Sequence, residues 1–162
     1  MGLTLRSLAL AVGLAATSVA AQEAMIAFGA LEQDTTLPVE VSADQFAVNN
    51  ADGSAVFSGN VVVTQGEMKL SAAKIQVNYG TDRKSIDQLI ASGGVIVTNL
   101  GDAAEAREAI YTIETGMIVL TGDVLLTQGP SAMAGQKLTI NLKDGTGIME
   151  GRVTTTFVPG GN

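Results

Sequence analysis

Residues 56–66 read VFSGNVVVTQG, and they align without a gap to residues 119–129, which read VLTGDVLLTQG. Both stretches contain the kernel Gly-x-Val, and weaker copies of this kernel occur twice more. The four kernels begin at Gly59, Gly93, Gly122 and Gly151, at spacings of 34, 29 and 29 residues. Repetition with a period of about 20–50 residues is typical of proteins assembled from copies of one supersecondary unit.

A second repeated stretch precedes each of these kernels. It covers residues 43–48, 72–77, 106–111 and 135–140. Both kinds of stretch alternate apolar and polar residues and favour strands, and glycines such as Gly116 and Gly145 supply turns between them. The sequence therefore predicts about four strand-turn-strand repeats in an all-β fold without helices. Residues 103–109 also suit a helix by composition, but their place in the repeat favours a strand.

The alternation places one apolar row on one face of the predicted sheet. Its larger members are Phe57, Val61, Val63, Leu89, Val95, Val97, Ile118, Leu120, Val124, Leu126, Met149 and Val153. The opposite row mixes polar and apolar residues, so we expect a sheet that curls around its own interior. That interior is either a dry core or an apolar groove. The repeated glycines either leave space for a ligand or mark bends and bulges.

The N-terminus has the three parts of a secretory signal. Residues 1–6 are a short positive start, residues 8–16 are apolar, and Val19, Ala20 and Ala21 form a small-residue cleavage site. The apolar run is far shorter than the ~20 residues that a membrane span needs. We therefore predict a cleavable signal peptide over residues 1–21, export, and a lead-in segment over residues 22–38.

Composition limits the chemistry that this chain can perform. It has no cysteine and no histidine, so disulfides, thiolate metal sites and the usual catalytic triads cannot be built. The net charge is -7, without a cluster of Lys or Arg, which argues against nucleic-acid binding. We predict a protein that is not an enzyme and that uses no cofactor and no metal.

Residues 55–66 resemble the signature of the OstA-like domain of the LptA family. A second landmark of that family is matched by residues 109–111 followed by residues 118–124, and a closing strand ends at residues 157–159. The resemblance extends over residues 39–159 and leaves residues 160–162 as a flexible tail. It implies a slightly twisted, open β-jellyroll of stacked antiparallel strands.

The resemblance also implies a function. Such domains are periplasmic carriers whose interior shields the lipid A acyl chains of lipopolysaccharide between the inner and outer membranes. The implied partners are an inner-membrane component of the LptC type, an outer-membrane assembly protein of the LptD type, and further copies of the chain, joined head to tail. The twelve residues of the apolar row are then the candidate lipid-binding set.

We expect the partners to pair with the unpaired first and last strands of the sheet. The candidate edge residues are Val39, Val41, Phe46, Val48, Val153, Thr155 and Phe157. Two other functions remain open for this fold. One is a membrane-anchored or outer-membrane-assembly component that carries the same domain, and the other is a secreted β-solenoid that acts on carbohydrate.

Overall fold

The computed structural model describes residues 24–27, 32–49, 51, 53–82 and 84–157. The predicted signal peptide (residues 1–21) and tail (residues 160–162) lie outside the described residues. Every regular element in the described part is a strand, which confirms the all-β prediction. The strands are β1 (Ala24–Ala27), β2 (Glu40–Ser42), β3 (Gln45–Asn49), β4 (Ser54–Gln65), β5 (Met68–Tyr79), β6 (Ile86–Asn99), β7 (Asp102–Thr112), β8 (Met117–Gln128), β9 (Ser131–Asn141), β10 (Thr146–Glu150) and β11 (Thr154–Thr156).

All strands belong to one antiparallel sheet in which β4 to β9 pair in chain order. Strands β2 and β3 both pair with β4, and β10 and β11 both pair with β9. Strands β2 and β3 therefore correspond to one long strand that is interrupted in the middle, and so do β10 and β11. Counted in this way, the meander has eight strands, which corresponds to the four predicted strand-turn-strand repeats. Residues 103–109 lie within β7, as the repeat predicted.

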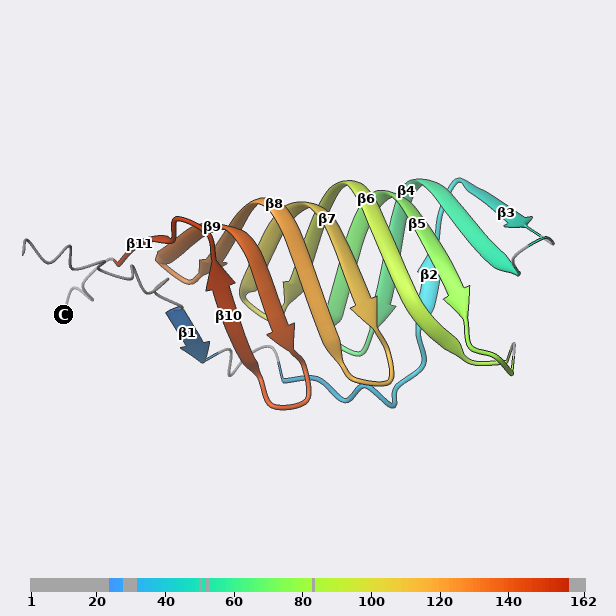
Figure 1. Ribbon diagram of the computed structural model, residues 1–162, viewed down its shortest axis with the longest axis horizontal. Coiled ribbons are helices and arrows are strands. Elements are labelled where there is room, and N and C mark those ends of the chain that lie inside the picture. Colours follow the sequence, from blue (N-terminus) through green and yellow to red (C-terminus); the bar gives the residue numbers. More distant parts are fainter. Residues whose placement is uncertain (1–23, 28–31, 50, 52, 83, 158–162) are drawn as a thin grey trace, which may run out of the picture.

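Each long strand bends at its middle, and the Gly-x-Val kernels coincide with the bends of β4, β6 and β8 and with the break between β10 and β11. The glycines have φ values of +78° at Gly59, +84° at Gly93, +85° at Gly122 and +84° at Gly151. The residues after them also have positive φ, and the pairing register shifts at the same level in every ladder from β4 to β9. The bends align along one side of the sheet, which we call the ridge (Figure 1).

Glycine is required at the ridge because neighbouring strands approach closely there. A Cβ atom at Gly93 would lie 2.7 Å from the Cβ of Ala73, and one at Gly151 would lie 2.7 Å from the Cβ of Gln136. A side chain at these φ values would also be strained. The second interpretation of the glycines is therefore correct: they mark bends, and at Gly93 and Gly151 they leave no spare space for a ligand.

The bends fold the sheet into two walls that face each other. The first wall contains residues 54–58, 75–79, 86–92, 108–112, 117–121, 137–141 and 146–150, with β3 at its edge. The second wall contains residues 61–65, 68–72, 95–99, 102–106, 124–128 and 131–135, with β2 and β11 at its edges. The apolar rows of both walls form one continuous core between them.

The predicted lead-in segment takes part in the fold. Strand β1 pairs antiparallel with β10, with Ala24 opposite Met149 and Ala27 opposite Thr146. Residues 32–38, which we call the strap, then run along the side of the sheet opposite the ridge and lead to β2 (Figure 1). The folded unit thus begins before residue 39, where the predicted domain began. No helix in the described ranges has the length and apolarity needed to cross a membrane.

Candidate functional site

The predicted apolar row lies between the two walls. Phe57 and Val153 are partly buried, and the other ten members are at most 1% exposed: Val61, Val63, Leu89, Val95, Val97, Ile118, Leu120, Val124, Leu126 and Met149. They are on the inner face because side chains of a strand alternate between faces, and the two-residue bend preserves the alternation. These side chains fill the interior, so the apolar row is a packed core.

The intervening strands contribute an equal share of the interior, which the predicted site residues omitted. Their inner side chains are also almost fully buried: Met68, Leu70, Ile75, Val77, Ala104, Ala109, Tyr111, Leu138 and Ile140. A signal for them was present, because the second repeated stretch carries the same period-two alternation. The interior is thus lined by both kinds of stretch, except that the first copy of the second stretch is exposed along β3.

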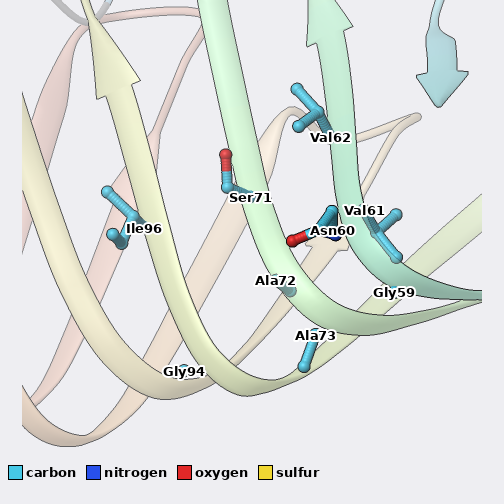
Figure 2. A pocket seen from close by; sticks show the side chains of 9 residues that line it. All are labelled: Gly59, Asn60, Val61, Val62, Ser71, Ala72, Ala73, Gly94 and Ile96. Atoms are coloured by element: carbon cyan, nitrogen blue, oxygen red, sulfur yellow. The ribbon is translucent and has the colours of Figure 1, made fainter. Parts of the chain in front are cut away.

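The surface hollows beside the bends lie outside this interior. One of about 420 Å³ lies beside the bends of β4, β5 and β6, where Val62, Ser71 and Ile96 line it together with Asn60 (Figure 2). A second, of about 240 Å³, is lined by the equivalent residues Leu125, Ala134 and Asp123, among others. Ile96 is 45% exposed and Leu125 is 37% exposed, so these hollows open to solvent on the outer face.

The side opposite the ridge, where the ends of the two walls meet, is the mouth of the folded sheet. Tyr111, at the end of β7 in the first wall, donates a hydrogen bond of 2.7 Å from its hydroxyl to Oε1 of Gln65. Gln65 ends β4 in the second wall and is only 1% exposed. Its position on the inner face was visible in the sequence, because it follows Val61 and Val63 at steps of two. Its contact with Tyr111 was not visible.

The strap covers this hydrogen bond. Nε2 of Gln65 donates to the carbonyl oxygens of Thr35 at 3.0 Å and Leu37 at 2.9 Å. In return, Nε2 of Gln33 donates to the carbonyl oxygen of Gln65 at 2.5 Å. The backbone N–H of Gln33 donates to the carbonyl oxygen of Leu142, beyond β9 in the first wall, at 2.8 Å. The strap is therefore hydrogen-bonded to both walls.

Burial keeps the Tyr111 hydroxyl in its donating form. Desolvation by burial raises the pKa of Tyr111 to about 12. The phenol therefore keeps its proton, which it donates to Gln65, to a higher pH than an exposed tyrosine would.

The candidate edge residues lie at the two ends of the folded sheet. Val41 is half-buried in β2, Val39 precedes that strand, and Phe46 and Val48 lie on β3 with exposed fractions of 58% and 57%. Phe46 packs against Phe57 with ring centroids 4.8 Å apart. At the other end, Val153 precedes β11, Thr155 lies within it, and Phe157 follows it and is 73% exposed.

The two ends differ in one respect that the prediction did not contain. Within the described residues, β2 and β3 pair only with β4, whereas the outer edge of β10 is occupied by β1. Strand β11 pairs with β9 alone. At the C-terminal end, β11 thus has one unpaired edge in the second wall within the described residues, and β1 forms the edge of the first wall.

Charged groups lie on the outside of the sheet. Arg107 forms an exposed ion pair with Asp123 at the ridge, and Lys137 pairs with Glu150 at 2.8 Å. The described ranges contain no group of three or more His, Cys, Asp or Glu side chains arranged to hold a metal ion. The chemistry that this interior offers is burial of apolar surface.

Comparison with known proteins is consistent with this architecture. The chain is 29% identical over 140 residues to the lipopolysaccharide export system protein LptA of Escherichia coli K12, covering 80% of this chain and 76% of that protein. An uncharacterised protein of Rhizobium meliloti is 28% identical over 161 residues, covering 93% of this chain and 87% of its own length.

The fold also matches a solved structure, LptH of Pseudomonas aeruginosa, described as the LptA-homologous periplasmic component of the lipopolysaccharide transport device. The TM-score is 0.69 at 19% identity, over 78% of this chain and 99% of that chain. The family model for the LptA/(LptD N-terminal domain) lipopolysaccharide transport protein matches residues 40–146. This match confirms the resemblance found in the repeats: the chain belongs to the LptA/LptD N-terminal domain family of lipopolysaccharide transport proteins.

Proposed function

We propose that this protein is a periplasmic carrier of lipopolysaccharide and forms part of the bridge between the inner and outer membranes. Its two walls shield the lipid A acyl chains while the sugars remain outside. A buried methylene group gains roughly 0.8 kcal/mol relative to water, so several acyl chains need continuous cover during transfer. An apolar interior provides this cover without any catalytic step.

The observation that carries the proposal is the continuity of the apolar interior. It runs from Val61 and Val63 near one end to Val124 and Leu126 near the other, and the buried polar side chains Ser54, Gln65 and Asn99 stand at strand ends. Family membership supports the same function, because the named relatives are a lipopolysaccharide export protein and a periplasmic transport component.

Two measurements test the proposal. Mass spectrometry of the protein purified from the cell envelope should detect lipopolysaccharide that co-purifies with it. The variant Leu120→Ser changes a side chain of the interior that is 0% exposed, and we expect it to weaken lipid A binding roughly five- to tenfold per folded molecule.

The matched control is Thr121→Ser, on the opposite face of β8 and only partly buried. It should bind lipid A as the wild-type protein does. Circular dichroism must show that both variants are folded. Equal binding by both folded variants would show that acyl chains do not occupy the interior.

The ends of the sheet are the proposed partner sites. An inner-membrane component of the LptC type, an outer-membrane protein of the LptD type, or a further copy of the chain would add strands to the edges at β2 and β3 and at β11. Backbone pairing of this kind extends both the sheet and its apolar interior into the partner. Because the two edges differ, the association is head to tail and gives an open chain of subunits.

The variant Thr155→Pro tests the C-terminal edge. Proline lacks an N–H group and disfavours addition of another strand beside β11. We expect self-association in sedimentation experiments to fall at least fivefold, and crosslinking to the membrane partners to fall in parallel. Thr155→Val retains the N–H group and is the control. Unchanged association of the proline variant would refute edge pairing at β11.

A further inference from the structure

The strap makes hydrogen bonds to both walls at the mouth, and it is held almost entirely by them. Gln33 and Thr35 are half-buried, whereas the side chains of Asp34, Thr36, Leu37 and Pro38 are exposed. A segment with little buried apolar surface opens locally at a far lower cost than the strands beneath it. The strap therefore differs from the rest of the fold in how easily it can be displaced.

The strap also fits closely against the hairpin turns at the mouth. A Cβ atom at Gly116, in the β7–β8 turn of the first wall, would lie 3.2 Å from Cγ2 of Thr35. One at Gly66, in the β4–β5 turn of the second wall, would lie 2.9 Å from Cδ1 of Leu37. The strap thus lies directly over the gap between the two walls.

Gln65 connects the strap to the interior. Its amide accepts from Tyr111 of the opposite wall and donates to two strap carbonyl groups, so one buried side chain joins all three parts. Loss of the strap leaves the Gln65 amide with unpaired donors, which weakens the closed arrangement. Opening of the strap and separation of the walls at the mouth are therefore coupled.

The interior is filled by its own side chains, so acyl chains need the walls to separate before they can enter. We propose that the strap, Gln65 and Tyr111 form a latch that closes the mouth of the folded sheet, and that lipid A enters sideways through this mouth when the latch opens. This inference rests on the proposed function and adds the route and the regulation of lipid entry. The ridge stays closed throughout, because there the two walls are continuous strands.

A cysteine pair at Thr35 and Gly116 would lock the latch. In a disulfide, the sulfur of one cysteine lies about 3 Å from the Cβ of the other. Cγ2 of Thr35 already lies 3.2 Å from the Cβ position at residue 116. The natural chain has no cysteine, so the engineered pair is the only one that can form within a molecule. Gly116 has a φ of +69°, so a cysteine there is strained in the oxidised and the reduced form alike, and the comparison between these two forms removes that cost.

The experiment measures the rate at which purified lipid A is captured from detergent by the double variant Thr35→Cys/Gly116→Cys. The oxidised protein should capture lipid A at least tenfold more slowly than the same protein after reduction. Oxidant and reductant should have no effect on the wild type. Equal rates for the oxidised and reduced forms would overturn the latch and leave the proposed function intact.

A second variant opens the latch instead of locking it. Gln33→Ala removes the side-chain bond from the strap to Gln65, and we expect it to accelerate lipid A capture about threefold or more. The control is Gln76→Ala, which removes a half-buried amide that donates to Asn78 on the outer face of β5 and not to the strap. Equal acceleration by both variants, or by neither, would contradict the latch.

Hydrogen exchange tests the latch without lipid. The N–H of Gln33, bonded to Leu142, should exchange by local opening at least a hundredfold faster than the amides of β7 and β8. Exchange of Gln33 at the same rate as these strands would mean that the strap opens only with global unfolding, which would refute the latch. A wild-type protein that captures no lipid A but shows fast strap exchange would refute the proposed function instead.

Discussion

The ridge and the mouth are the two long sides of the folded sheet, and different kinds of bond hold them together. At the ridge, the backbone of each of the strands β4 to β9 passes from one wall to the other. At the mouth, the walls are joined by the Tyr111–Gln65 hydrogen bond and by the strap. Separation of the walls at the ridge would disrupt every strand, whereas separation at the mouth breaks a few hydrogen bonds and exposes apolar side chains of the core. One side of the folded sheet is thus joined by continuous backbone, and the other is joined by side-chain packing and by hydrogen bonds.

The largest effect is expected at the ridge. Gly93→Ala introduces a side chain at φ +84° and a contact of 2.7 Å with the Cβ of Ala73. We expect the free energy of unfolding to fall by about 2–3 kcal/mol, as measured by urea denaturation.

The neighbouring glycine is the matched control. Gly94 has nothing within 4 Å of its Cβ position, and its counterparts Asn60 and Asp123 are not glycine although they have φ values of 47° and 48°. Gly94 has a φ of +84°, so Gly94→Asn retains the backbone strain but adds no close contact, and it should lower stability by about 1 kcal/mol or less. Equal losses at positions 93 and 94 would show that the close approach of strands is not the reason for glycine at the ridge.

A smaller effect is expected at the mouth. Tyr111→Phe retains the packed ring but removes the hydroxyl that pairs with the buried Gln65 amide. The unpaired acceptor should lower the free energy of unfolding by about 1–2 kcal/mol in the same assay.

The other tyrosine of the chain provides the comparison. Tyr79 ends β5 and is 40% exposed, so Tyr79→Phe should change stability by less than about 0.5 kcal/mol. If both variants behave alike, the Tyr111–Gln65 bond does not contribute to closure of the mouth.

The smallest effect concerns acid. Thr36 donates to Oδ1 of Asp34 from its hydroxyl at 2.5 Å and from its backbone N–H at 2.9 Å, and these bonds lower the pKa of Asp34 below 3.8. A lowered pKa means that the turn in the strap is fully stabilised above the ordinary pKa. This stabilisation is lost as the pH falls through the pKa of the folded protein.

We therefore expect the Thr36 amide resonance to titrate with a midpoint below the ordinary aspartate pKa of 3.8 when NMR spectra are recorded during acidification. Ridge amides, such as that of Gly93, which has no acidic neighbour in the sequence, should not follow the same titration. Asp34→Asn should abolish the Thr36 shift. A midpoint above 3.8 for Asp34 would contradict the hydrogen-bonded turn.

The predicted strands and the apolar row could be derived from the sequence because both depend on local rules. Period-two alternation assigned Leu120 and Val124 to the inner face, and both are buried there. The repeat also resolved residues 103–109 correctly as strand, against their composition. For the kernel glycines, the alignment gave their positions but left open whether they leave space for a ligand or mark bends. The structure shows that they mark bends, because Ala73 of the neighbouring strand approaches Gly93 closely, and the sequence alone does not reveal this contact.

The sequence by itself thus determined the long strands of the meander and their inner face, since a side chain's direction follows from its position in its own strand. It did not reveal β1, which lies in the predicted lead-in segment. Tertiary structure alone decided how the sheet is closed. Tyr111 and Gln65 are 46 residues apart, and β1 pairs with β10 across most of the chain. No local pattern encodes such contacts, because they exist only after the bends have brought distant strand ends together. The mouth and its strap are therefore properties of the folded sheet.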